Sequence, residues 1–140
     1  MGNLIIVGAD DSATALKAAE AAADLAVSLG RPLHVVTAFD EEETIDITVG
    51  SDRFLITSVD AAEDRARKVA SSLVRDGLEV TSSARLGKPQ DVIINEAKER
   101  DASIIVVGNR RMQGPTRLLG SVASSVAHHA PCDVYIVKTT

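Results

Sequence analysis

Two kinds of hydrophobic pattern alternate along the chain. Short, nearly continuous apolar runs are typical of strands buried on both faces, whereas apolar residues that recur every three or four positions are typical of amphipathic helices. The apolar runs predict strands at residues 3–9, 33–39, 103–107 and 133–137, and moderate alternation predicts a further strand at residues 78–86. The helical spacing predicts helices at residues 16–29, 55–76, 89–101 and 121–130.

Residues typical of helix ends flank these helical segments. The polar stretch Asp10-Asp11-Ser12 precedes the first helix and can cap it, and Gly30 and Gly77 follow the first and second helices. Pro89 suits a first helical turn, and Pro131 stops the last helix. The pattern therefore predicts strands and helices in strict alternation.

Two connecting segments show no clean period. Residues 40–53 begin with an acidic cluster and are predicted to form a long surface loop, in which residues 45–49 could pair locally. Residues 109–119 are predicted to form a basic loop that contains glycine.

Strict alternation predicts one α/β domain over residues 1–140, with a parallel sheet covered by helices on both faces. Two strand orders fit, 2-1-3-4-5 and 3-2-1-4-5, and both reverse their winding beside the first strand. Ligands of open α/β sheets bind at such a reversal, outside the carboxyl ends of the strands. In the second order this crevice lies between Gly8-Ala9-Asp10 and the segment from Val107 to Arg111.

Composition narrows the possible functions. The 140 residues include no Trp and only three aromatic residues, Phe39, Phe54 and Tyr135, so aliphatic residues must form the core. Nucleic-acid binding through aromatic stacking is not expected, and the net charge of −5 argues against broad contact with a phosphate backbone. Cys132 is the only cysteine, which excludes an intrachain disulfide. We expect a cytoplasmic protein, because the chain shows no leader pattern and no apolar run long enough to span a membrane.

The segment GNRRMQGPTRLLGS, residues 108–121, is the strongest candidate for chemistry. It connects an apolar strand to a helix that begins near Gly120-Ser121, and a helix N-terminus offers backbone N–H groups to a phosphate. Arg110, Arg111 and Arg117 could add charge-assisted contacts. The alternative is an ordinary helix cap beside solvated arginines. The segment is not a Walker loop, because no Gly-Lys-Ser/Thr follows at the required spacing.

Other chemically capable residues have structural explanations. Asp11 is a helix cap, and Asp10 is either a cap or a ligand. His128 and His129 are adjacent on a helix and point about 100° apart, which does not suit a metal pair. His34 is predicted to be structural. No catalytic triad is visible.

Several motifs together resemble the universal stress protein family. They are LIIVGADDS at 4–12, LHVVTAF at 33–39, Gly-Lys-Pro at 87–89, and the segment 104–137. The resemblance covers essentially the whole chain. It implies a Rossmann-like fold with strand order 3-2-1-4-5 and a homodimer that pairs the last strands of two subunits, through Val134, Tyr135, Ile136 and Val137.

Members of the family that bind ATP share a pattern of Gly, two residues, Gly, nine residues, Gly, then Ser or Thr. Gly108, Gly120 and Ser121 match it, but Arg111 occupies the second glycine position and eight residues follow instead of nine. Arg111 could block a nucleotide or place its guanidinium on a phosphate.

The resemblance also implies roles at other positions. Asp10 would contact the nucleotide, directly or through nucleotide-bound Mg²⁺, and the backbone of Ala38 would meet adenine. Ser121 and Val122 would contact phosphate. With so few aromatic residues, adenine would lie against aliphatic side chains and backbone near Ala9, Ala38 and Val107.

These observations favour a small stress-response regulatory protein that binds ATP or a related adenine nucleotide between the first and fourth strands. Two alternatives stay open. One is a nucleotide-free homodimer that acts through protein contacts, which the altered loop would favour. The other is a slow ATPase or related adenine-nucleotide hydrolase, although no general base is evident in the sequence.

Overall fold

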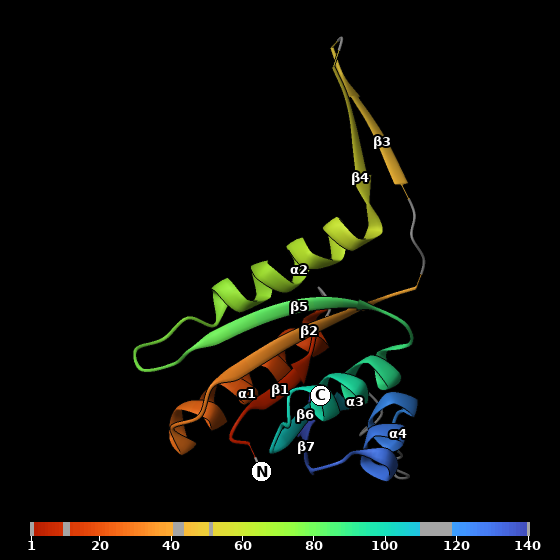
Figure 1. Cartoon of the computed structure of the whole chain (residues 1–140). Helices are drawn as coiled ribbons and strands as arrows, with labels where there is room; N and C mark the ends of the chain where they lie inside the picture. The colour runs from red at the N-terminus through yellow and green to blue at the C-terminus, as the bar shows by residue number, and fades with distance from the viewer. Residues whose placement is uncertain (1, 10–11, 41–43, 51, 110–118, 140) are drawn as a thin grey trace.

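Five parallel strands form the central sheet of the computed structural model, which describes residues 2–9, 12–40, 44–50, 52–109 and 119–139 (Figure 1). The strands lie in the order β5-β2-β1-β6-β7. They comprise β1 (Ile5–Gly8), β2 (Leu33–Phe39), β5 (Val80–Leu86), β6 (Ile104–Asn109) and β7 (Asp133–Lys138). Counted along the chain, this is the order 3-2-1-4-5, so that prediction is confirmed and the order 2-1-3-4-5 is excluded.

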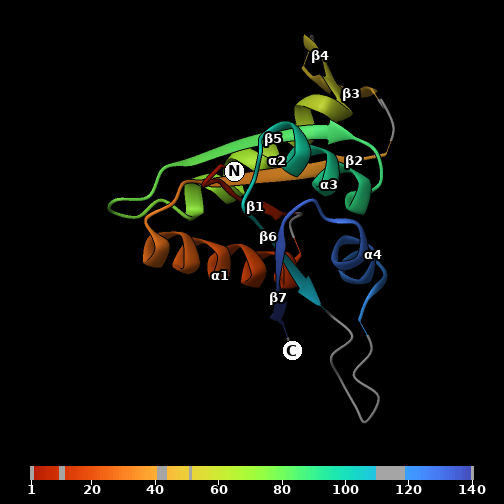
Figure 2. The ribbon, with the colours of Figure 1, turned by 60° about the horizontal axis from the view of Figure 1, so that its bottom comes forward.

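Helices cover both faces of this sheet. One face packs against α1 (Ala13–Leu29) and α2 (Ser58–Ser72), and the other against α3 (Pro89–Glu99) and α4 (Ser121–His129). Figure 2 shows α1 and α4 on opposite sides of β6 and β7. The predicted Rossmann-like architecture is therefore present.

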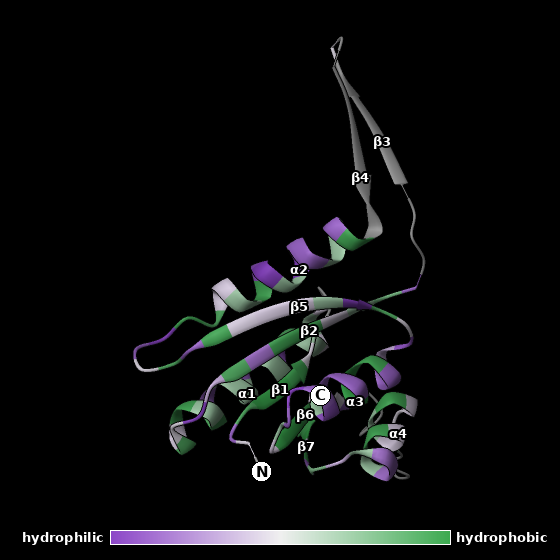
Figure 3. Cartoon of the chain, in the orientation of Figure 1, coloured by the Kyte–Doolittle hydropathy of each residue, from purple (hydrophilic) through white to green (hydrophobic). Residues whose placement is uncertain are grey.

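Alternate residues of the central strands enter two separate cores. On β1, Ile5 and Val7 face the alanine-rich side of α1, while Ile6 packs with Ile105 and Val126 on the other face. All three β1 side chains are completely buried, and β1 carries the hydrophobic colour in Figure 3. This two-sided burial is the reason that the strand reads as a continuous apolar run.

Three of the predicted helix-end residues are confirmed, namely Ser12, Gly30 and Pro89, whereas Gly77 does not end α2, which already ends at Ser72. Asp10 and Asp11 lie outside the described residues. The Ser12 side chain accepts a hydrogen bond from the backbone N–H of Ala15 at 3.1 Å, and Gly30 ends α1 in the left-handed conformation, with φ of 64°. Pro89 occupies the first turn of α3. None of the described helices is both long and apolar enough to cross a membrane.

The predicted surface loop over residues 40–53 is wrong where the structure describes residues 44–49 and 52–53, whereas the local pairing that the sequence allows for residues 45–49 is confirmed. Instead, β3 (Thr44–Val49) and β4 (Asp52–Thr57) form a two-stranded antiparallel ribbon, and the following helix begins at Ser58 rather than near Leu55. Gly50, with φ of 64°, supplies the left-handed residue that short hairpin loops favour. The β-branched residues around Leu55 thus form a strand, although their apolar positions also fit a helical period.

A buried polar cluster lies where α3 crosses β2 and β5. His34 is only 1% exposed, and its Nδ1 and Nε2 atoms share hydrogen bonds with the hydroxyls of Thr81 and Ser83, at 2.6 and 2.8 Å. The Glu96 Oε2 atom lies 3.6 Å from His34 Nε2. His34, predicted to be structural, therefore joins the two strands to the helix.

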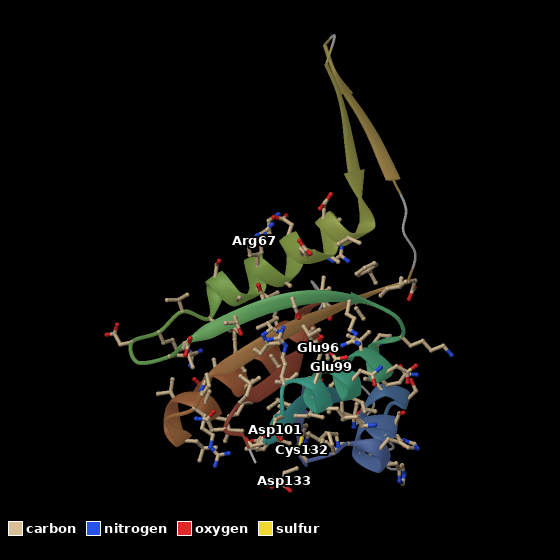
Figure 4. The ribbon with its side chains drawn as sticks, viewed as in Figure 1. Arg67, Glu96, Glu99, Asp101, Cys132 and Asp133 are labelled. Carbon is tan, nitrogen blue, oxygen red and sulfur yellow. The ribbon has the colours of Figure 1, made fainter. Side chains whose placement is uncertain are left out.

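Two arginines complete this cluster around the buried Glu96 carboxylate. Arg100 Nε donates to Oε2 at 2.6 Å, and Arg85 Nη1 donates to Oε1 at 3.0 Å. Arg85 also binds Glu99 through both terminal nitrogens, and Figure 4 shows Glu96 and Glu99 on the side of α3 that faces β5. Burial raises the pKa of Glu96, but the hydrogen bonds from Arg100 and Arg85 outweigh it and hold the pKa below its ordinary value.

The protonation of His34 should control stability in mildly acidic solution. Burial lowers the pKa of His34 from 6.5 to about 4, with Arg100 acting in the same direction and Glu96 opposing it. Because the folded pKa lies below the unfolded one, stability is fully present above pH 6.5 and declines toward pH 4. We expect a loss of about 2–3 kcal/mol between pH 6.5 and 4.5, measured by urea unfolding.

The control is His34→Gln, which cannot gain a proton in this window. Its stability should fall less steeply than that of the original chain between pH 6.5 and 4.5. The carboxylate of Glu96 titrates mainly below this window, because its pKa is lowered. Equal slopes for the two proteins would show that His34 does not carry the effect.

Candidate functional site

A cavity of about 450 Å³ opens at the carboxyl ends of β1 and β6. The two strands are neighbours, with Val7 opposite Val106, and the chain winds in opposite directions on either side of them. α1 leaves toward one face and α4 begins on the other, so the space between the strand ends stays open. The structure thus contains a crevice at the place that the strand order predicts.

Most of the predicted site residues that the structure describes surround this one cavity. The predicted residues along its lining are Ala9, Ala38, Val107, Gly108, Gly120, Ser121 and Val122. The remaining predicted residues, Asp10, Arg110 and Arg111, lie outside the described residues, as does the rest of the basic loop at 110–118.

Part of the cavity lining is aliphatic. Val36, Ala38 and Val107 contribute from the strands, and Pro89 and Ile93 contribute from α3. Such a surface can hold a flat, weakly polar group through dispersion and burial.

The end of β1 is held firmly beside this apolar surface. The backbone N–H of Ala9 donates to the carbonyl of Val36 at 2.9 Å, and the Thr37 hydroxyl donates to the Ala9 carbonyl at 2.9 Å. Thr37 is buried, so these bonds lie away from water and fix the edge of the cavity.

The start of α4 also contributes to the cavity lining. Gly120 is the residue before the helix, and the first N–H groups of any helix lack an intrahelical acceptor. The Gly120 N–H already donates to Asn109 Oδ1 at 2.9 Å, which leaves the amides of Ser121 and Val122 as the donors nearest to the cavity. These amides and the Ser121 hydroxyl suit an anionic oxygen.

Asn109 also lines the cavity, at a position that the sequence predicts to lie in a loop. It is the last residue of β6, it is 1% exposed, and it joins the end of that strand to the start of α4 through Gly120. The Thr139 hydroxyl donates to the Asn109 carbonyl at 2.9 Å, which ties the residues after β7 to the same point. The signal in the sequence for this residue was its polar amide, which comes directly after an apolar strand and Gly108.

Packing accounts for Gly108. A Cβ atom there would lie 3.1 Å from Thr139 Cγ2, 3.3 Å from Ala18 Cβ and 3.4 Å from Thr14 Cγ2. Gly108 therefore lets α1 and the C-terminal segment approach β6, whether or not a ligand is bound. Its match to a nucleotide motif is not, by itself, evidence for a nucleotide.

The other predicted chemical groups do not meet at a second site. His128 and His129 lie in the last turn of α4, and His129 Nδ1 is 3.0 Å from the Ser125 carbonyl oxygen. Cys132 packs against the α3–α4 core, where burial raises the pKa of its thiol. Among the described residues, no three His, Cys, Asp or Glu side chains gather closely enough to hold a metal ion.

Fold and cavity together define a single α/β domain of Rossmann-like type, with a crevice where its winding reverses. A model of the universal stress protein family matches residues 1–138. The chain therefore belongs to the universal stress protein family.

Curated relatives with that name align over different lengths. Universal stress protein G of Salmonella typhimurium is 35% identical over 77 residues, which cover 55% of this chain and 54% of the relative. A universal stress protein of Methanothermobacter thermautotrophicus is 42% identical over 55 residues, covering 39% of this chain and 38% of the relative. The matched regions thus span about two fifths to one half of these relatives. Universal stress protein MJ0531 of Methanocaldococcus jannaschii is 26% identical over 96% of this chain and 81% of its own length.

Solved structures of the family match nearly the whole chain. A universal stress protein from Archaeoglobus fulgidus is 27% identical, with a TM-score of 0.73 over 99% of this chain and 100% of its own. The same organism's universal stress protein in complex with dAMP is 26% identical, with a TM-score of 0.71 over 98% of both chains. A universal stress protein in complex with cAMP is 26% identical, with a TM-score of 0.71 over 99% of this chain and 98% of its own.

The close packing of Gly8 against α3 should affect the stability of the fold measurably. A Cβ atom at Gly8 would lie 2.5 Å from Ile93 Cδ1, and Ile93 is buried at the cavity wall. Gly8→Ala should therefore destabilise the fold by about 1–3 kcal/mol in urea unfolding. Ile93→Val removes the clashing methyl group, so the double variant should lose less than the two single losses combined, by at least about 0.5 kcal/mol. Strictly additive losses would contradict this packing.

Proposed function

We propose that this chain binds an adenine nucleotide in the crevice between β1 and β6 and acts as a stress-response regulatory protein in the cytoplasm. The observation that carries the proposal is one cavity whose lining combines aliphatic side chains with the first residues of α4. The complexes of related proteins with cAMP and dAMP support the choice of adenine.

In the proposed complex, adenine lies against Val36, Ala38 and Ile93. The phosphate accepts hydrogen bonds from the amides of Ser121 and Val122 and from the Ser121 hydroxyl, near the positive end of the helix dipole. A nucleoside monophosphate unit is common to ATP, cAMP and dAMP, so these contacts apply to each of them.

We propose more specifically that the nucleotide is ATP, with Mg²⁺ bound to its phosphates. Its further phosphates would extend toward Asp10, Arg110 and Arg111, whose charges suit Mg²⁺ and phosphate respectively. Asp10→Asn should then weaken ATP binding more in Mg²⁺ than in its absence, and should leave cAMP binding unchanged.

Two substitutions of Ser121 test the proposed phosphate contacts directly. Ser121→Ala removes the hydroxyl, whereas Ser121→Pro also removes the amide hydrogen at a first-turn position that tolerates proline. By calorimetric titration with ATP, ADP, AMP and cAMP, we expect affinity to fall about threefold to tenfold for Ser121→Ala and at least about tenfold further for Ser121→Pro.

The matched control is Ser124→Ala, one turn along the same helix and away from the cavity lining. It should keep the original affinity. If the unaltered chain takes up no adenine nucleotide, the binding proposal fails and the nucleotide-free alternative takes its place. Steady release of phosphate from ATP would instead favour the hydrolase alternative.

We also propose a homodimer through β7. This strand lies at the edge of the sheet, paired with β6 on one side, and Tyr135 is 49% exposed. Edge strands carry backbone groups that a second strand can pair. Val134 and Ile136 pack toward the α3–α4 core and Val137 toward the α1 core, so pairing would extend both layers into the partner.

A charge on this edge should separate the subunits. Tyr135→Lys would place two like charges near the twofold axis, while the fold tolerates it because the side chain is half exposed. Sedimentation velocity should show a dimer for the original chain at micromolar concentration and a clear shift to monomer for the variant. Lys138→Gln, at the exposed end of the same strand, should stay dimeric, and a monomeric original chain would refute the dimer.

A further inference from the structure

The outer edge of β5 carries backbone groups that no described strand pairs. β5 lies at one end of the sheet, and among the described strands it pairs with β2 alone. The Glu79 carbonyl accepts a hydrogen bond from the Leu33 N–H, and the Gly87 N–H donates to the Phe39 carbonyl, each at 2.9 Å. Because successive residues of a strand direct their backbone groups to alternate sides, odd-numbered residues from 79 to 87 face β2. The residues that face outward are Val80, Ser82, Ala84 and Leu86.

β5 lacks the features that usually protect an edge strand. Lysine, proline or a β-bulge commonly prevents a second chain from pairing with such an edge. The seven residues of β5 include neither Lys nor Pro, and they pair with β2 in unbroken register. Its charged side chain, Arg85, is bound to Glu96 and Glu99 of the same chain. The edge can therefore accept another strand.

A second cavity, of about 290 Å³, lies along the middle of this edge. Ser82, Ser83 and Ala84 line it from β5, and Glu63 and Arg67 line it from α2. Figure 4 shows Arg67 on α2, the helix that runs beside β5. Space is thus open next to Ser82 and Ala84, the two outward-facing residues at the centre of the strand.

Glu63 and Arg67 place opposite charges one helical turn apart beside this edge. Both residues are exposed, and the Arg67 side chain is 65% exposed. Arg67 lies 3.8 Å from Asp64, which Lys68 binds more closely, at 3.0 Å. A long ion pair in solvent contributes little free energy, so Arg67 can bind another carboxylate at small cost.

A twofold axis at Ser83 makes this edge complementary to itself. Antiparallel pairing about that axis places Ser82 opposite Ala84 of a second copy, and each outward-facing pair can exchange two backbone hydrogen bonds. The same register places Leu86 opposite Val80, on the face that α2 covers. Leu86 is 53% exposed within one chain, so this pairing would also bury apolar surface.

The spacing of the two α2 helices also suits this arrangement. α2 packs over both β2 and β5, so its axis lies between these strands. The α2 helix of the second copy would lie two strand spacings away, about 10 Å, which is a normal distance between packed helices. Since the twofold axis reverses the direction of the second helix, Glu63 of each copy meets Arg67 of the other.

We propose that the outer edge of β5 pairs antiparallel with the same edge of a second copy, with Glu63 and Arg67 of the two α2 helices bound across the twofold axis. Exposed ion pairs and backbone hydrogen bonds each contribute modestly, so we expect a Kd on the order of 100 μM, weaker than the contact proposed for β7. β7 is the opposite edge of the sheet, so a chain that used both edges would form an open row of subunits.

Charge reversal tests the contact in the Tyr135→Lys background, where association through β7 does not contribute. Glu63→Arg leaves two positive charges beside the edge and Arg67→Glu leaves two negative ones, so each alone should weaken self-association at least about tenfold. An equimolar mixture of the two variants should restore it to within about threefold, because opposite charges then meet. Lys17→Glu, an exposed change of the same size on α1, is the control and should have no effect.

The measurement is sedimentation equilibrium from about 10 μM to about 1 mM. Interference optics are needed, because Tyr135→Lys removes the only tyrosine from a chain without tryptophan.

Proline on the edge tests the backbone pairing separately. Ala84→Pro removes an N–H group that faces outward, so the ladder with β2 stays intact. It should weaken self-association at least about tenfold, whereas Ala84→Ser, which keeps the N–H group, should change it by less than about threefold. Urea unfolding of Ala84→Pro checks that the fold is retained.

A disulfide identifies the register directly. In a chain that also carries Cys132→Ser, Ser83→Cys places one thiol from each copy on the axis, where facing Cα atoms lie about 4.5 Å apart. This variant should form linked dimers in oxidised glutathione. Leu86→Cys is the control, because it is exposed but lies far from the axis in this register, and it should not form them.

Three results would overturn the proposal. They are a Tyr135→Lys chain that stays monomeric up to about 1 mM, association that a folded Ala84→Pro variant leaves unchanged, and a mixture of the two charge variants that associates no better than either alone. Nucleotide titration of the same variants should give the original affinity. A failure of this contact is therefore distinct from a failure of the proposed nucleotide binding.

Discussion

The pairing of β1 between β2 and β6 is the constraint on which the rest of the molecule depends. A strand in the centre of a parallel sheet is covered on both faces, so Ile5, Ile6 and Val7 must all be apolar. The chain runs outward from β1 in two directions, toward β2 and then toward β6. The helices after β1 and before β7 consequently lie on opposite faces, and the crevice at the end of β1 follows from that arrangement alone.

α3 connects this crevice to the buried polar cluster. Its first half contributes Pro89 and Ile93 to the cavity wall, and its second half contributes Glu96 and Glu99 to the ion pairs with Arg85. Moving Glu96 away from Arg85 and Arg100 would leave a buried carboxylate without its partners. These ion pairs therefore hold the second half of α3 in a definite position. Because a helix moves as a rigid element over one or two turns, the cluster also fixes the wall formed by Ile93.

The central strands could be predicted from the sequence because their pattern has one physical cause. Two-sided burial makes Leu33–Phe39 apolar except at His34 and Thr37, whose buried polar groups are hydrogen-bonded, and the observed β2 has the predicted bounds. The ribbon could not be predicted in the same way, since its apolar and polar residues alternate within a short segment that also carries acidic residues. The sequence allows local pairing for residues 45–49, but it divides the partner strand, Asp52–Thr57, between the predicted loop and the predicted helix that begins near Leu55. Leu55 and Ile56 fit both periods, and only the register with Asp46 and Ile45 decides between them.

The candidate site shows that a match to a sequence motif does not by itself identify a ligand. Gly108 matches a nucleotide pattern, yet a Cβ atom there would also crowd the side chains of Thr14, Ala18 and Thr139, at 3.1–3.4 Å. A Cβ at Gly120 would likewise lie 3.3 Å from Asn109 Oδ1, the atom that orients the start of α4. Both glycines therefore relieve close contacts whether or not a ligand is bound. The groups that support a nucleotide independently of this packing are the amides of Ser121 and Val122 and the aliphatic residues of the same cavity lining.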